Sequence, residues 1–161
     1  MKSIAVAVLF GIIYTVCAHA ASKGLKVDVT LTPVGSFQVS SDRLKGKVVR
    51  AGGKLKADKI TVPVEGLKTG MDLRDEHLHK KLKNGSITIR EAVAENGKGT
   101  GLININGVEK KFPFTYREMG KDYVEAKFDL SLKEFGLTGL SYMDVGVNDM
   151  VSAVVVLPVS E

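Results

Sequence analysis

Residues 124–132 read VEAKFDLSL, and this stretch decides the fold class. Charged or polar residues stand at every second position, and apolar residues stand between them. A period of two is typical of a β-strand with one face in a core and the other in water. The stretch therefore predicts a half-buried strand, whose inward stripe is Val124, Ala126, Phe128, Leu130 and Leu132.

The same alternation recurs along most of the chain. Its apolar positions are Leu25, Val27, Val29 and Leu31; Phe37 and Val39; Ile60, Val62 and Val64; Ile87 and Ile89; Ile103 and Ile105; and Phe112, Phe114 and Tyr116. Turn signals such as Asn96-Gly97 and Asn106-Gly107 separate several of these runs. Short strands at this regular spacing are typical of a β-sandwich or a β-barrel. The last run, residues 151–159, is apolar throughout most of its length and predicts a strand covered on both faces.

Residues 72–83, DLRDEHLHKKLK, break the alternation and predict a short helix. Acidic residues come first and basic residues last, which complements the helix dipole. Asp72 is placed to cap the helix, with Asp75 at the capping-box position. Asn84-Gly85 can end it. Leu78 and Leu82 share one face, which would pack onto a barrel or its mouth.

The first residues have the pattern of a secretory signal peptide. Lys2 precedes an uncharged apolar stretch, residues 4–16, and Ala18-His19-Ala20 is a cleavage site of the A-x-A type. We therefore expect residues 1–20 to be removed, leaving residues 21–161 as a single periplasmic or secreted domain. A buried N-terminal helix is the less favoured alternative.

The single cysteine, Cys17, lies within this segment. A lipid anchor on Cys17 is disfavoured because Thr15-Val16 precede it, where a lipobox needs small residues. Removal of the segment leaves no thiol for a disulfide, so the core alone must stabilise the domain.

Composition indicates one soluble globular domain. The chain has 161 residues, of which 44% are hydrophobic and 25% charged, and it has no charged low-complexity run. Its net charge is +5, which cleavage lowers by the one unit of Lys2. This mild, dispersed excess does not indicate nucleic-acid binding, and it is compatible with contact with an anionic membrane surface.

Sequence signatures of catalysis are absent. The chain has no G-x-S-x-G, H-E-x-x-H or C-x-x-C motif, and residues 97–101, GKGTG, lack the G-K-[ST] of a phosphate loop. We expect a protein that is not an enzyme. A small hydrolase or isomerase that uses His77 is a weaker hypothesis.

The expected helix carries His77 and His79, which are the histidines of residues 21–161. Residues two apart on a helix face different directions, so the pair is poorly placed to chelate one metal ion. Asp75 and His79, four apart, are better placed but supply only two ligands. We therefore expect no metal and an ordinary solvated helix face.

Arg74 and Asp75 are adjacent, so on a helix their side chains point apart and each needs another partner. The pair is interpreted as a helix-entry feature, with a polar gate for a ligand headgroup as the alternative.

The inward stripes of two predicted strands are the candidate ligand-binding residues. They can fill a solid core or line a hollow barrel, because a small closed barrel does one or the other. The packing density of protein interiors by itself favours the solid core. The candidates are Phe112, Phe114, Tyr116, Ala126, Phe128, Leu130 and Leu132.

The chain also resembles a known family, the YceI-like proteins. Residues 69–78, TGMDLRDEHL, resemble the family stretch T-G-x-x-x-R-D-x-H-L, and residues 101–108, GLININGV, resemble its G-x-L-x-x-x-G-V hairpin. Phe135-Gly136-Leu137 and the closing strand after Asp149 fit in the same order. The family-motif positions are Thr69, Gly70, Arg74, Asp75, His77 and Leu78.

The resemblance implies a lipocalin-like antiparallel β-barrel of about eight strands, with an apolar tunnel and one short helix near residues 72–83. It implies a carrier in the bacterial envelope that binds a long-chain apolar or amphiphilic ligand, an isoprenoid or fatty-acyl lipid, with no other cofactor. The alternative is a ligand-free barrel that binds an unknown protein partner in an envelope redox or stress pathway. Leu132 stands where many members carry Arg, which implies a more apolar lumen.

Overall fold

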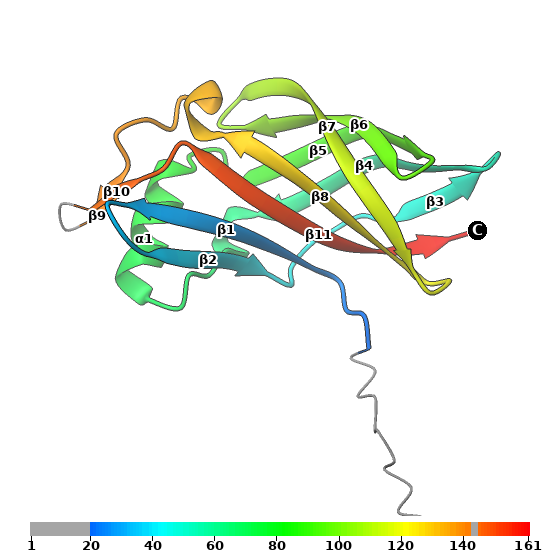
Figure 1. The fold of residues 1–161 in the computed structure, drawn as a ribbon, viewed down its shortest axis with the longest axis horizontal. Coiled ribbons are helices and arrows are strands. Elements are labelled where there is room, and N and C mark those ends of the chain that lie inside the picture. Colours follow the sequence, from blue (N-terminus) through cyan, green and yellow to red (C-terminus); the bar gives the residue numbers. More distant parts are fainter. Residues whose placement is uncertain (1–19, 143–144) are drawn as a thin grey trace, which may run out of the picture.

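The computed structural model describes residues 20–142 and 145–161 (Figure 1), so the expected signal peptide lies almost wholly outside the described residues. Within them, no helix is long and apolar enough to cross a bilayer. The elements in chain order are β1 (Gly24–Thr32), β2 (Ser36–Ser41), β3 (Val48–Ala51), β4 (Lys54–Pro63), the 3-10 turn η1 (Val64–Gly66), α1 (Asp72–Lys81), β5 (Ser86–Glu95), β6 (Lys98–Ile105), β7 (Val108–Met119), β8 (Tyr123–Ser131), the 3-10 turn η2 (Leu132–Phe135), β9 (Ser141–Tyr142), β10 (Val145–Val147) and β11 (Met150–Ser160).

The strands form a closed barrel, which confirms the predicted all-β fold. Neighbours pair in the order β3-β4-β5-β6-β7-β8-β11, and β3 also pairs with β11 to close the ring. The closing pair is parallel, with Val48 opposite Val159 and Val49 opposite Ser160. The other strand pairs of the described chain are antiparallel. Closure leaves this ring without the exposed edges of an open sheet.

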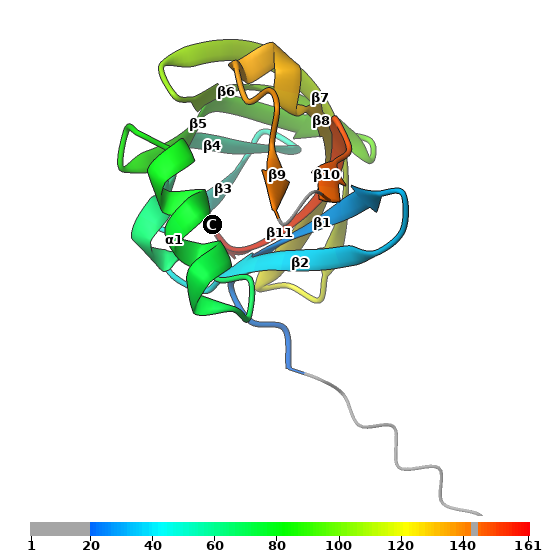
Figure 2. The ribbon, with the colours of Figure 1, turned by 90° about the vertical axis from the view of Figure 1, so that its left-hand side faces the viewer.

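At the end that carries α1, four more strands extend the wall: β1, β2 and the short strands β10 and β9, of which β10 pairs with β1 and β9 with β10. β1 pairs with residues 152–156 of β11. Further along the same edge of β11, Val159 and Ser160 pair with β3 instead. β2 pairs with β1, and Ser40 of β2 forms a bridge to Lys68 after β4. Barrel diameter grows with the number of strands, so this end is wider. Figure 2 looks into it, with α1 on one side and β1 and β2 below.

A close backbone contact with β4 fixes the segment that connects β2 to β3. Lys45 and Thr61 exchange two backbone hydrogen bonds of 2.8 Å, which bind this segment to β4. The next residue, Gly46, has φ +123°, and a Cβ there would lie 2.6 Å from the carbonyl oxygen of Lys59. Only glycine fits this position.

The core lies inside the barrel, as the alternation predicts. The inward residues of β11 are Val151, Ala153, Val155 and Leu157, each 3–4% exposed. Between them, Ser152 is exposed and Val154 and Val156 are half-buried. The prediction that both faces of this strand are covered is therefore wrong. α1 lies across one end of the barrel and does not cover the outside of β11 (Figures 1 and 2).

α1 begins where the sequence predicts but is capped differently. Met71 is the residue that precedes its first turn, and no side chain caps it. Asp72 is the first helical residue, so the prediction that it caps the helix is wrong. The Asp75 carboxylate accepts hydrogen bonds from Thr69, in the chain that leads into the helix. The helix ends at Lys81, two residues earlier than predicted.

Candidate ligand-binding cavity

The wide end of the barrel is hollow. It holds a cavity of about 720 Å³, here called the wide chamber, within the range of about 300–1,000 Å³ that small-molecule sites occupy. The walls are mostly aliphatic and come from β1, β2, β5, β6, β8, β9, β10, β11, α1, η2 and the neighbouring loops. Representative lining residues are Leu25, Val27, Val29, Leu31, Leu130 and Leu132. An apolar ligand chain would be stabilised here by about 25 cal/mol for each Å² of apolar surface removed from water.

Four basic side chains of α1 line the same chamber: Arg74, His77, Lys80 and Lys81. No aspartate or glutamate is among its described lining residues. The charged side chains of the wall are therefore all cationic. Thr69 and Ser141 add neutral hydroxyl groups. A carboxylate or phosphate placed beside α1 would meet attraction from these side chains.

Asp75 holds the start of α1 in place. Its Oδ1 accepts one hydrogen bond from the backbone N–H of Thr69 and one from the Thr69 hydroxyl, each 2.7 Å long. Asp75 is only 5% exposed, and its Oδ2 lies 3.7 Å from Lys68 Nζ. The hydroxyl hydrogen bond is the largest cause that lowers the pKa of Asp75, followed on the lowering side by the backbone hydrogen bond and the charge of Lys68, and these outweigh burial. Asp75 is therefore a structural carboxylate.

Arg74 points away from Asp75, as expected for adjacent helical residues. Its guanidinium carbon lies 4.2 Å from the centroid of the Phe37 ring on β2, a cation–π geometry. Both residues line the wide chamber, so this contact joins α1 to β2 at the mouth.

The two histidines have different surroundings. His79 Nε2 lies 2.9 Å from the backbone carbonyl oxygen of Leu67, to which its N–H can donate. His77 is exposed and lines the wide chamber. Among residues 20–142 and 145–161, no three His, Cys, Asp or Glu side chains lie close enough to hold a metal ion.

Asn106, in the turn between β6 and β7, holds the other end of α1. Its Oδ1 accepts from the Lys83 backbone N–H at 2.9 Å, and its Nδ2 donates to the Lys81 carbonyl oxygen at 2.8 Å. The helix that carries the cationic side chains is thus tied down at both ends.

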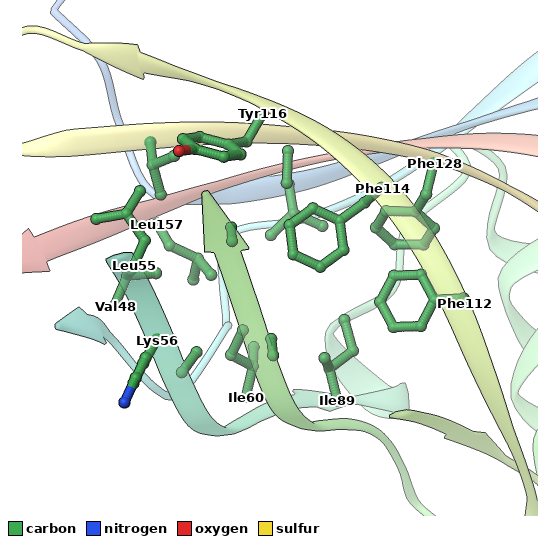
Figure 3. A pocket seen from close by; sticks show the side chains of 16 residues that line it. Val48, Leu55, Lys56, Ile60, Ile89, Phe112, Phe114, Tyr116, Phe128 and Leu157 are labelled. Carbon is green, nitrogen blue, oxygen red and sulfur yellow. The ribbon is translucent and has the colours of Figure 1, made fainter. Parts of the chain in front are cut away.

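The opposite end of the barrel is filled. A space of about 50 Å³, here called the narrow chamber, is lined by 16 residues that do not include any lining residue of the wide chamber (Figure 3). Five of the seven candidates from the sequence line it: Phe112, Phe114, Tyr116, Ala126 and Phe128. The other two, Leu130 and Leu132, line the wide chamber.

The structure also places the motif positions. Arg74, His77, Leu78 and Thr69 line the wide chamber, Asp75 is bonded to Thr69, and Gly70 has φ +84° at the entry to α1. Leu132 adds an apolar side chain to the wall. That these residues contact a ligand remains a prediction.

Sequence reasoning missed the part of the lining that β1 and β2 supply. The alternation of Leu25, Val27, Val29 and Leu31 is as regular as that of β8, and it was a signal for an inward stripe. Periodicity does not show which part of a barrel is hollow, so these positions were not distinguished from core.

The described residues form a β-barrel that is filled at one end and hollow at the other, with a helix across the hollow end. A family model described as YceI-like domain matches residues 14–159. The chain belongs to this family. A comparison with curated proteins finds no match.

Solved structures have the same fold. BcnA from Burkholderia cenocepacia has a TM-score of 0.64 at 15% identity, over 84% of this chain and 96% of that one. A polyisoprenoid binding domain from Saccharophagus degradans, implicated in plant cell wall breakdown, has a TM-score of 0.60 at 12% identity, over 83% and 91%. A YceI protein from Campylobacter jejuni has a TM-score of 0.53 at 18% identity, over 76% and 85%.

Proposed function

We propose that this protein is a carrier in the bacterial periplasm that binds one amphiphile, with its apolar chain in the wide chamber and its headgroup beside α1. The observation that carries the proposal is the aliphatic cavity of about 720 Å³. A cavity of this size with an aliphatic wall is a site for apolar ligands. The resemblance in fold to a polyisoprenoid binding domain supports the same kind of ligand.

The charge of the lining favours an acidic headgroup. Arg74, Lys80 and Lys81 line the cavity together with His77, and no acidic residue of the described chain does so. A carboxylate or phosphate headgroup would therefore bind more tightly than a hydroxyl or amide of the same size.

Cavity blocking tests the ligand site. Leu130→Trp places an indole in the wide chamber, whereas Lys127→Trp places one on the exposed face of the same strand. After delipidation, hexadecanoate should bind the parent and Lys127→Trp with similar Kd and should bind Leu130→Trp at least tenfold more weakly. Displacement of a fluorescent fatty acid measures this. Equal binding by all three proteins would place the ligand elsewhere and overturn the proposal.

A comparison of hexadecanoate with hexadecanol tests the headgroup. The triple variant Arg74→Gln, Lys80→Gln, Lys81→Gln should weaken hexadecanoate binding by about three- to 150-fold, because exposed ion pairs contribute about 0.2–1 kcal/mol each and 1.4 kcal/mol corresponds to tenfold. Hexadecanol binding should be unchanged. An equal loss of affinity for both ligands would show that the basic residues do not distinguish a carboxylate headgroup from a hydroxyl.

The periplasmic location is tested by mass. The A-x-A site at residues 18–20 leads us to expect that protein isolated from its native envelope begins at Ala21. Intact-mass measurement of that fraction checks it, and a mass that retains an acylated Cys17 would contradict the proposed soluble carrier. Native mass spectrometry of the same sample would reveal a bound lipid.

A further inference from the structure

The two chambers meet at one layer of the barrel wall. On β8, Leu130 lines the wide chamber, and the next inward residue, Phe128, lines the narrow one. On β5 the same step occurs between Ile87 and Ile89. On these two strands, the change from hollow to filled therefore takes place within one inward position.

Aromatic rings from the neighbouring strands β7 and β8 fill this layer. The ring centroids of Phe112 on β7 and Phe128 on β8 lie 4.7 Å apart, and Phe114 lies 5.7 Å from Phe112. Phe112 is 4% exposed and Phe128 9%. Figure 3 shows the three rings gathered at one end of the narrow chamber, with Tyr116 and Leu157 at the other.

The backbone of β6 is shaped to receive these rings. Gly101 pairs with Phe112 and Gly99 with Phe114 across the β6–β7 ladder. A Cβ at Gly99 would lie 2.3 Å from Cζ of Phe114, and one at Gly101 would lie 3.2 Å from Cε1 of Phe112. Small residues opposite large ones fill a narrowing barrel. The rings of Phe112 and Phe114 therefore pack directly against the backbone of β6, which limits their movement toward that strand.

We propose that Phe112 and Phe128 form a fixed floor that limits the length of the ligand chain. This inference rests on the proposed function and concerns the same cavity. At about 30 Å³ for each water-sized group, 720 Å³ holds about 24 non-hydrogen atoms. The ligand class is a single-chain amphiphile of about this size or smaller. A long polyisoprenoid would leave much of its chain outside the mouth, in water.

A chain-length series on the delipidated full domain tests the floor. The probes are the saturated carboxylates dodecanoate, hexadecanoate, eicosanoate and tetracosanoate, and the readout is displacement of a bound fluorescent fatty acid. Affinity should rise by about three- to fourfold for each buried methylene, and the rise should stop between eicosanoate and tetracosanoate. A continued rise through tetracosanoate would overturn the floor and leave the carrier function intact. Binding of none of the probes would overturn the proposed function as well.

Two variants should shift the chain-length limit in opposite directions. Phe128→Ala should let the rise continue through tetracosanoate, whereas Val151→Phe, which adds a ring to the wide chamber, should stop it near hexadecanoate. Leu157→Ala removes a buried side chain at the far end of the narrow chamber and should leave the limit where it is. If Phe128→Ala does not fold, Val151→Phe still decides. An unchanged limit in Val151→Phe would overturn the proposal.

Discussion

The backbone N–H and the hydroxyl of Thr69 converge on a single carboxylate oxygen of Asp75, each at 2.7 Å. This double contact closes the loop that leads into α1, the helix that carries the basic wall of the wide chamber. The geometry at the mouth of the cavity therefore depends on one nearly buried carboxylate.

Asp75→Asn should destabilise the domain. The amide retains the size of the side chain but loses the charge that strengthens both hydrogen bonds and the pairing with Lys68. Hydrogen bonds to charged groups contribute about 1.5–3 kcal/mol, so we expect a loss of about 2 kcal/mol at pH 7 in urea unfolding. Asp72→Asn, which removes an exposed carboxylate of the same helix, should change stability by less than about 0.5 kcal/mol. If the two changes lowered the free energy of unfolding equally, the hydrogen bonds from Thr69 to Asp75 would contribute no more to stability than an exposed carboxylate does.

Stability should also depend on pH through Asp75. Because folding lowers its pKa, its contribution is fully present above the unfolded value of about 3.9 and is lost as the pH falls through the folded value. The difference in unfolding free energy between the parent and Asp75→Asn should therefore be constant from pH 7 to about pH 5 and shrink below pH 4. Urea titrations at each pH measure it. A difference that stays constant down to pH 2 would contradict the assignment.

Gly99→Ala tests the packing of Phe114, the ring beside the proposed floor, against the backbone of β6. The new methyl group meets Phe114 at 2.3 Å and the Val93 carbonyl oxygen at 2.7 Å. Overpacking costs about 1–3 kcal/mol, more than the gain of about 0.4–1 kcal/mol from a stiffer unfolded chain. We expect a lower Tm by calorimetry, with partial recovery in the double variant Gly99→Ala, Phe114→Leu.

Gly24→Ala is the matched control for this substitution. A Cβ at Gly24 in β1 would meet only the Ser41 carbonyl oxygen, at an ordinary 3.5 Å. Its Tm should equal or exceed that of the parent. A Gly99→Ala protein as stable as Gly24→Ala would show that the rings have room to move.

Asn106→Gly should loosen the C-terminal end of α1 without disturbing the turn. Glycine adopts the φ of +53° that Asn106 has, but it lacks the two side-chain hydrogen bonds to Lys81 and Lys83. We expect faster amide hydrogen exchange at Lys83 and a loss of about 1 kcal/mol. Asn96→Gly, at the same φ in the β5–β6 turn, should leave exchange at Lys83 unchanged. Equal exchange rates in the two variants would show that Asn106 does not hold the helix.

Local pattern was sufficient to predict α1 and the longer strands, but it did not predict β3, β9 or β10. The alternation from Val124 to Leu132 and the break at residues 72–83 place strand and helix correctly, because side-chain period and backbone geometry are linked residue by residue. The turn signals Asn96-Gly97 and Asn106-Gly107 are turns with positive φ in the structure. The capping prediction at Asp72 failed, since it assumed that Asp75 would bond within the helix when its partner is Thr69.

The all-β class, the position of the helix and the inward direction of the stripes therefore follow from the amino-acid sequence. Only the tertiary structure decided that β3 closes on β11, that Phe128 lies in a filled layer and that Leu130, two residues later, faces a cavity. Whether an inward position is filled depends on the volume of the residues that meet it across the barrel, such as Phe112 and the glycines of β6. Those partners come from distant parts of the chain, and the period of a single strand carries no information about them.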